Sequence, residues 1–142
     1  SRFLYVAVGA SCLWYMRLQW DYQQWCEVLN NKNIQTWVAY RSGTPIGYFE
    51  LEKQSEGSTE ICYFGLLPAF IGQGLGKKLL VDAIGKAWSL GGKRVWLHTC
   101  SLDHPSALQN YLSRGFTIFK QEDLIEDVPD QPIQPWPHAN SR

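Results

Sequence analysis

The chain has 142 residues, a length that fits one domain with a substantial core. Apolar residues make up 45% and charged residues 18%, which argues against a disordered chain. Basic and acidic residues number 13 each, so no basic excess indicates nucleic acid or an anionic membrane as a partner. No apolar run approaches the roughly 20 residues that a membrane span requires.

The cysteines are far apart and form no C-x-x-C pair, which argues against a zinc site and against a disulfide scaffold. They are Cys12, Cys26, Cys62 and Cys100. Reduced thiols fit a cytosolic protein, so we expect a cytoplasmic location and no metal. The first eight residues are too short and too aromatic for a signal peptide.

Two helices and an antiparallel meander are predicted in the first half of the chain. Residues 3–9 form the first helix. The second helix begins at Asp21, a favoured N-cap residue, and continues through Leu29. Three β-rich segments separated by turn residues follow, at 34–40, 45–51 and 59–66.

The second half of the chain adds a crossover to this meander. Residues 74–90 carry apolar side chains at helical spacing. The later elements are a strand at 94–100, a short helix from Asp103 and Pro105 through Leu112, and a last strand at 116–119. Strand, helix and strand across 59–100 imply a right-handed crossover with parallel pairing. The predicted fold class is therefore α+β, with a mixed, mostly antiparallel sheet flanked by helices.

Residues 1–126 are predicted to form a single domain, and the composition changes at Asp127. Four prolines fall in the last 16 residues, which predicts an extended or disordered tail over 127–142. An alternative is that this tail wraps a partner subunit.

The stretch that is most informative about function reads GLLPAFIGQGLGKK, at 65–78, between a strand and a helix. Glycines at alternate positions, 72, 74 and 76, let the backbone turn tightly and approach a ligand closely. Free amides at a helix N-terminus favour an anion, and Lys77 and Lys78 add positive charge. A phosphate or pyrophosphate is the natural ligand.

Two common phosphate motifs do not fit this loop. A Walker loop fails because Ile71 and Lys78 occupy two of its fixed positions. A Rossmann motif fails because Lys77 or Leu79 would replace its third glycine. A glycine-rich turn without a ligand stays an alternative.

The glycine loop and a second motif further along the chain together resemble the GNAT superfamily of N-acetyltransferases. The sequence IGQGLG at 71–76, with Pro68 upstream, is similar to the family loop R/Q-x-x-G-x-G/A. The sequence HPSALQNYLSRGF at 104–116 is similar to the family pattern N-x-x-A-x-x-x-Y-x-x-x-G-F. The combination is more specific than either motif alone, and the resemblance covers about residues 34–120.

The chain departs from the family pattern in several places. Ile71 replaces the usual Arg or Gln, and His104 replaces the usual Asn. The first strand of the family has no clear counterpart, so Ser1 would fall after it. A final strand after Phe119 is poorly marked, which leaves a sheet edge that another subunit, as in a homodimer, would complete.

The resemblance implies acetyl-CoA as cosubstrate. The backbone amides of the loop would hold its pyrophosphate, from Gly72, Gln73, Gly74, Leu75, Gly76 and Lys77. Near Leu66 and Leu67 the third strand would splay from its parallel neighbour, and the pantetheine arm would lie in that gap. Gly65 is suited to a bulge that opens the gap. By the same resemblance His104 would contact the cofactor arm, with a helix-start role or a substrate contact as alternatives.

Acyl transfer needs a base for the amine and an acid for the departing thiolate. The resemblance assigns the acid to Tyr111, a phenol that is protonated at neutral pH. Glu60, eleven residues before Ile71, resembles the basic glutamate of the histone-acetylating branch. His98 on the next strand is the rival base. Packing or solvated roles stay open for all three candidates.

The acceptor is expected to be a small-molecule or protein amine. Aromatic residues of the first third would line its cleft or belong to the core: Trp14, Trp20, Tyr22 and Trp25. Cys62 and Cys100 are interpreted as buried thiols rather than as nucleophiles. A non-catalytic CoA-binding regulatory module and a plain interaction subunit are the alternatives to an enzyme.

Overall fold

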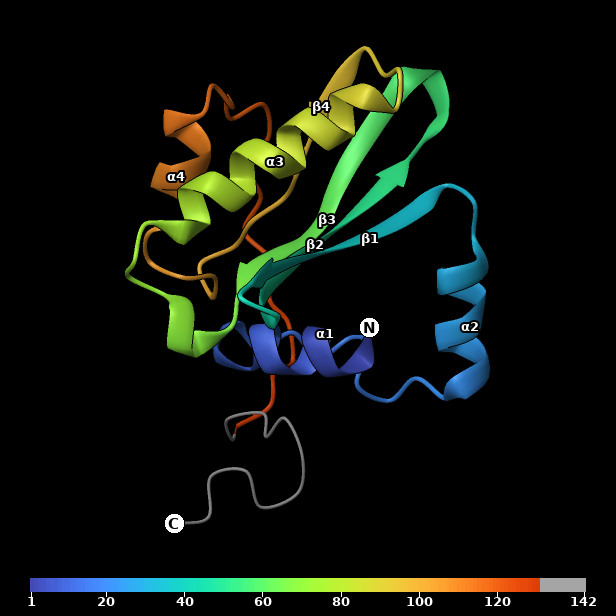
Figure 1. Ribbon diagram of the computed structural model, residues 1–142, viewed down its shortest axis with the longest axis vertical. Coiled ribbons are helices and arrows are strands. Elements are labelled where there is room, and N and C mark those ends of the chain that lie inside the picture. Colours follow the sequence, from blue (N-terminus) through green and yellow to red (C-terminus); the bar gives the residue numbers. More distant parts are fainter. Residues whose placement is uncertain (131–142) are drawn as a thin grey trace.

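A four-stranded mixed sheet organises residues 1–130, the part of the chain that the computed structural model describes (Figure 1). The strands lie in the order β1 (Ile34–Arg41), β2 (Thr44–Lys53), β3 (Ser58–Leu66) and β4 (Arg94–Trp96). The first three pair antiparallel, and β4 pairs parallel to β3. The predicted α+β class and the three-stranded meander are confirmed.

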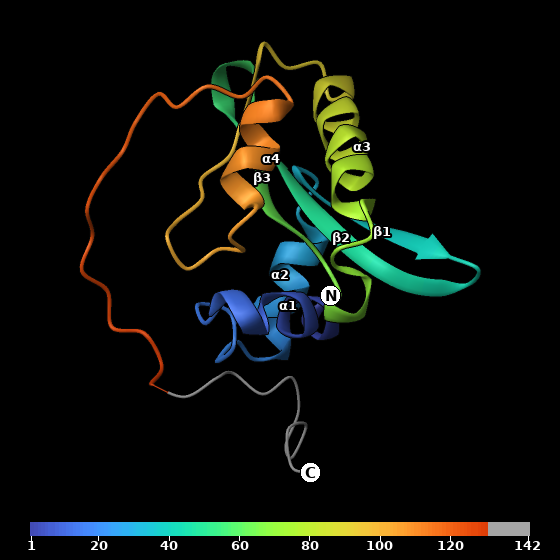
Figure 2. The same ribbon diagram turned by 90° about the vertical axis from the view of Figure 1, so that its left-hand side faces the viewer.

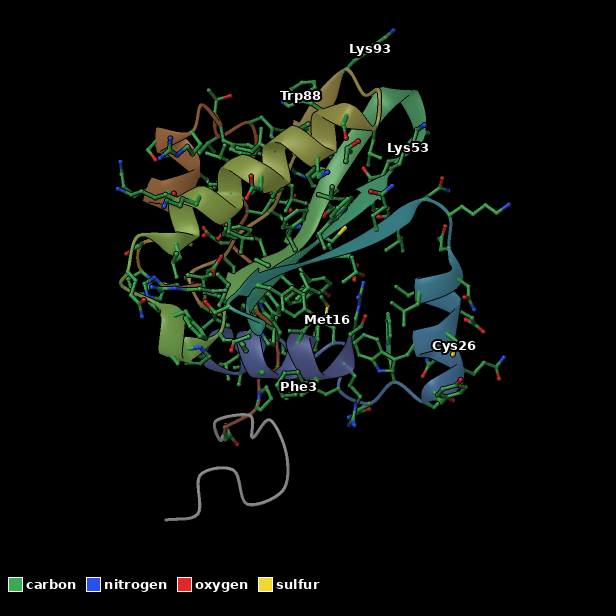
Figure 3. The ribbon with its side chains drawn as sticks, in the orientation of Figure 1. Phe3, Met16, Cys26, Lys53, Trp88 and Lys93 are labelled. Carbon is green, nitrogen blue, oxygen red and sulfur yellow. The ribbon has the colours of Figure 1, made fainter. Side chains whose placement is uncertain are left out.

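Helices cover both faces of this sheet (Figure 1, Figure 2). One face carries α1 (Arg2–Gly9) and α2 (Tyr22–Asn30), and the other carries α3 (Leu75–Ser89) and α4 (Ala107–Ser113). Three short 3-10 turns join the elements: η1 (Ala10–Cys12), η2 (Ser55–Gly57) and η3 (Pro68–Phe70). Side chains fill the space between the sheet and the helices of each face (Figure 3).

The main core lies between the sheet and α3. The buried face of this helix consists of Leu79, Leu80, Ala83 and Ala87. These side chains pack in one cluster with Phe49, Leu51 and Ile61 from the neighbouring strands. Removing this apolar surface from water stabilises the fold by about 25 cal/mol for each Å² buried. The apolar stripe predicted at 74–90 is confirmed.

Helix α2 begins where its cap predicts. The Asp21 carboxylate accepts a hydrogen bond from the Gln24 amide at 2.9 Å, and the Gln24 side chain accepts one from the Asp21 amide at 2.9 Å. This reciprocal capping satisfies two backbone donors that the first turn leaves unpaired.

The strand predicted at 94–100 is wrong beyond Trp96. Its ladder with β3 covers only three residue pairs, which end at Glu60 and Trp96. Beyond this point the two strands part, and a strand without a neighbour has no ladder to extend. The Asp103 amide instead donates to the Cys100 carbonyl at 3.1 Å and closes a turn.

The last strand predicted at 116–119 is absent from the described residues. Phe119 packs its ring on Trp96 at 6.4 Å between centroids, and the Arg94 guanidinium lies 4.6 Å from the centre of the Phe119 ring. Because β4 is only three residues long, it offers little edge to a further strand. Ring contacts hold this segment in place of a ladder.

Asp103 does not cap the short helix as predicted. The helix α4 starts at Ala107, after Ser106. The Asp103 carboxylate accepts instead from the Thr99 hydroxyl at 2.7 Å and from the His104 amide at 2.8 Å. It therefore fixes the loop that leads into the helix.

The bulge of β3 falls at Cys62, so the prediction of a bulge at Gly65 is wrong. Glu50 pairs with Tyr63 while Leu51 pairs with Ile61, which leaves Cys62 as the extra residue. Gly65 has a different role. A Cβ there would lie 2.5 Å from Val8 Cγ1, so the missing side chain lets α1 approach β3.

We expect Gly47→Ala to lower the free energy of unfolding by about 1–3 kcal/mol. A Cβ at Gly47 would lie 2.5 Å from the Gly65 carbonyl oxygen, and backbone cannot move aside cheaply. Gly85→Ala is the matched control, because nothing lies within 4 Å of a Cβ at that helical position. It should raise stability by about 0.5–1 kcal/mol. Urea unfolding measures both, and equal effects would contradict the assigned crowding.

Most of the predicted tail, residues 131–142, lies outside the residues that the structure describes. Residues 127–130 form no helix or strand. Glu126 just before them accepts a hydrogen bond from the Tyr15 hydroxyl at 2.9 Å. Among residues 1–130, none of the helices has the length and apolar character needed to cross a bilayer.

Candidate active site

The site is built around the point where β3 and β4 part. Their last paired residues are Glu60 and Trp96, while β3 continues to Leu66. The gap therefore opens toward the glycine loop that follows β3. Lys53 and Lys93 mark the opposite end of the sheet (Figure 3).

The backbone of Leu66 faces this gap. The Leu67 amide donates to the Ile46 carbonyl at 2.8 Å, so it points toward β2. Backbone groups of successive strand residues point to opposite neighbours. The peptide groups of Leu66 and Phe64 are therefore directed to the side that β4 has left.

The glycine loop has the backbone of an anion site. Gly72 and Gly74 have φ of +83° and +74°, which other residues adopt at a cost, and nothing lies within 4 Å of a Cβ built at either. Gly74 is the N-cap of α3, so the amides of the first turn have no partner within the helix. These amides, from Leu75 to Lys77, lie at the positive end of a 15-residue helix.

Arg41 reaches the loop from the end of β1. Its guanidinium donates to the Gln73 side-chain oxygen at 3.3 Å, and the Gln73 amide group donates to the Ala69 carbonyl at 3.1 Å. The structure thus brings a cation to the loop although position 71 is an isoleucine. Nothing in the local sequence pointed to Arg41, because 32 residues separate it from Gln73.

The two rival bases lie in contact. His98 Nδ1 and Glu60 Oε1 are 2.9 Å apart. The carboxylate is buried, while 65% of the imidazole surface is exposed. The hydrogen bond with Glu60 raises the pKa of His98, and the desolvation of the ring opposes this only partly.

Two residues that sequence reasoning did not select complete this pair. The Gln54 amide group donates to Glu60 Oε2 at 2.8 Å, and Gln54 Oε1 accepts from the Trp96 indole at 2.9 Å. No sequence motif marks Gln54. Gln54 and Trp96 come together with Glu60 because the pairing of β3 with β4 places Glu60 opposite Trp96.

Tyr111 lies on the other face of the sheet, in the core under α3 and α4. Its ring packs edge to face on Phe64 at 6.1 Å and on Phe116 at 6.2 Å between centroids. Burial raises the pKa of Tyr111, and the nearby Asp103 carboxylate adds to this rise.

His104 lies in the exposed loop before α4. Its Nδ1 accepts a hydrogen bond from the Ser106 amide at 3.1 Å. The local geometry thus fits the helix-start role that the sequence left open, and it leaves Nε2 for other partners.

A buried ion pair supports the α1–α2 side of the sheet. Arg17 and Glu50 form two hydrogen bonds of 2.7 Å, and their exposed fractions are 9% and 2%. Aromatic rings surround the guanidinium, from Tyr5, Trp20, Trp25 and Tyr63. No sequence motif marks this pair, because 33 residues separate its members.

The early aromatic residues divide between core and cleft. Trp14 packs on Tyr5 and Tyr63. A hollow of about 530 Å³ is lined by Trp20, Tyr22, Trp25, Leu29, Ser1 and Arg2. The Trp25 indole nitrogen is buried and has no hydrogen-bond partner among the described residues.

Two carboxylates and a thiol gather next to His98. Side-chain atoms of Glu52, Glu60 and Cys62 lie within 4.8 Å of one another. Burial raises the pKa of Cys62, and the neighbouring carboxylates add to this effect, so the thiol is not a nucleophile at neutral pH. Cys100 is exposed, so its interpretation as a buried thiol is wrong.

This arrangement defines a class of protein, and the family comparison agrees with it. Residues 5–116 match the model of the Acetyltransferase (GNAT) family. The chain belongs to the GNAT family of acetyltransferases, and the predicted resemblance is confirmed. A comparison with curated protein sequences gives no significant match.

Solved structures show the same fold. An aminoglycoside acetyltransferase from an uncultured soil metagenomic sample is 20% identical with a TM-score of 0.68, covering 88% of this chain and 85% of its own. The aminoglycoside acetyltransferase AAC(6')-Iy, bound to a bisubstrate analog, is 16% identical with a TM-score of 0.62, covering 81% and 84%. A transcriptional regulator from Bacillus halodurans is 23% identical with a TM-score of 0.62, covering 74% and 73%.

Proposed function

We propose that this protein transfers the acetyl group of acetyl-CoA directly to a primary amine. One observation carries the proposal. The gap between β3 and β4 leads from the glycine loop to Glu60 and His98, and Tyr111 lies on the opposite face of the sheet. A thioester in that gap would have a base on one side and an acid on the other.

The loop would hold the pyrophosphate of the cosubstrate. Amides from Gly72 to Lys77 supply the donors, and Arg41 and Lys78 supply positive charge nearby. The backbone of Leu66 would pair with the pantetheine amides across the gap. His104 would contact the same arm through its free Nε2.

The chemistry needs one base and one acid. Glu60 or its partner His98 takes a proton from the acceptor ammonium, and the amine attacks the thioester carbonyl. The C–N bond forms and the C–S bond breaks. Tyr111 then protonates the departing sulfur, which a phenol with a raised pKa can do at neutral pH.

The acceptor would approach from the α1–α2 side. Glu60 lies on that face because its neighbour Ile61 points into the core under α3, and the bulge at Cys62 brings Tyr63 to the same face. The hollow beside Trp20 and Trp25 opens on this side, and aromatic side chains form most of its wall. A small-molecule amine or a protein amine fits this description, and the aminoglycoside acetyltransferases of the same fold favour the former.

Calorimetric titration with acetyl-CoA tests the proposal, followed by a screen of amines with detection of released thiol. Micromolar binding, about −8 kcal/mol, together with turnover of at least one amine class is the expected result. Binding without turnover of any amine would favour a non-catalytic CoA-binding regulatory module. Absence of binding would refute both functions.

We expect Tyr111→Phe to lower kcat about 10²-fold and to leave acetyl-CoA affinity within about twofold. The ring keeps its edge contacts with Phe64 and Phe116, and only the proton donor is lost. Steady-state kinetics and calorimetry separate the two quantities. Tyr15→Phe is the control, because that hydroxyl binds Glu126 at the surface. Equal kcat for Tyr111→Phe and wild type would remove Tyr111 from the mechanism.

A further inference from the structure

We propose that His98 is the group that takes the proton from the acceptor, and that Gln54 and Trp96 are positioning residues that hold its partner Glu60. This inference rests on the proposed acetyl transfer and assigns roles within that site. The four side chains form a continuous chain of hydrogen bonds from β4 back to the turn after β2.

The Glu60 contact determines which nitrogen of His98 is basic. A carboxylate only accepts hydrogen bonds, so the contact of 2.9 Å places the imidazole proton on Nδ1. Nε2 then carries the lone pair. Since 65% of the His98 side-chain surface is exposed, an acceptor amine can reach Nε2, whereas the Glu60 side chain is 11% exposed and already holds two partners.

Trp96 determines the orientation of Gln54. An indole N–H can only donate, so the oxygen of the Gln54 amide must face Trp96 and its NH₂ group must face the carboxylates. That group donates to Glu60 Oε2 at 2.8 Å and to Glu52 Oε2 at 3.3 Å. Both Glu60 oxygens are thereby used, one toward Gln54 and one toward His98.

Among residues 1–130, few other charged groups surround the His98–Glu60 pair. Glu52 on β2 and the neutral thiol of Cys62 on β3 lie near Glu60. On β4, the Arg94 guanidinium lies 5.7 Å from the Trp96 ring centre. The contact with Glu60 is therefore the main interaction that favours the protonated imidazole.

The protons balance with these roles. His98 Nε2 takes one proton from the acceptor ammonium and releases it to solvent after the transfer. The free amine forms the C–N bond and the C–S bond breaks. The sulfur takes its proton from Tyr111, which is restored by the second proton of the attacking nitrogen.

Nuclear magnetic resonance titration of the three histidines tests the pair without a known acceptor. Glu60→Gln should lower the pKa of His98, since the amide carries no charge to stabilise the imidazolium. Glu52→Gln, which neutralises a nearby carboxylate that does not touch His98, is the matched control and should lower it by less than half as much. The assigned contact between His98 and Glu60 would be overturned if the two variants lowered the His98 pKa equally, or if neither changed it.

Kinetics with an amine found in the screen tests the roles. His98→Gln should lower kcat about 10²-fold. Trp96→Phe and Gln54→Leu should each lower kcat about tenfold without changing KM for acetyl-CoA. The acid limb of the pH profile should move to lower pH in Glu60→Gln, by the same amount as the His98 pKa.

Several results would overturn these roles. Full kcat in His98→Gln would make Glu60 the base, and a change in KM alone for Gln54→Leu would leave it a structural residue. If the wild-type protein does not bind acetyl-CoA, the proposed function is refuted. The titration of His98 does not depend on acetyl-CoA, so a failure of the proposed function can be distinguished from a failure of the assigned His98–Glu60 contact.

Discussion

Gly74→Asp should weaken acetyl-CoA binding by more than 100-fold, or about 2.8 kcal/mol. Gly74 is the N-cap of α3 and lies among the amides that would hold the pyrophosphate. An aspartate there places a negative charge where the phosphates must lie. Nothing in the protein lies within 4 Å of the added Cβ, so the effect should fall on the ligand instead of on packing. Calorimetry with acetyl-CoA measures it.

Gly74→Asn is the control for this experiment. Asparagine has the shape of aspartate and tolerates the φ of +74° about as well, but it carries no charge. We expect it to weaken binding only about tenfold. Urea unfolding should show that both variants lose about 1 kcal/mol, the cost of a side chain in the left-handed region. Equal binding by the aspartate and wild-type proteins would place the cosubstrate elsewhere.

The second large effect concerns stability. Arg17→Met should lower the free energy of unfolding by about 3–5 kcal/mol, because it leaves the Glu50 carboxylate buried without a charged partner. Glu50 is 2% exposed, and both of its oxygens accept from Arg17. Urea unfolding at neutral pH measures the loss.

Two further variants separate charge from packing. The double variant Arg17→Met with Glu50→Leu should recover most of the loss, since it removes both buried charges. Lys120→Met breaks an ion pair with Glu122 whose side chains are 64% and 55% exposed, and it should change stability by less than about 1 kcal/mol. If Arg17→Met lowered the free energy of unfolding as little as Lys120→Met, the Arg17 guanidinium would not be a buried partner on which Glu50 depends.

The local sequence determined most of the secondary structure. Apolar spacing predicted α3, Asp21 predicted the start of α2, and turn residues separated the three strands of the meander. These signals act over a few residues, so they survive without tertiary information. The predictions of a last strand and of a longer β4 were wrong because a strand depends on a neighbour that is distant in sequence. β4 pairs with β3 over three residues only.

The sequence by itself also determined the family, and it predicted two parts of the candidate site, the glycine loop and the motif that contains Tyr111, because each is contiguous in the chain. Only the tertiary structure decided how the candidates relate. Glu60 and His98 are rivals in the sequence and partners in the fold, since parallel pairing joins residues 38 apart. Arg41 and the Arg17–Glu50 pair came only from the structure, because their partners are more than 30 residues away. Gln54 came only from the structure because its link to Trp96, 42 residues away, exists only once the sheet sets its register.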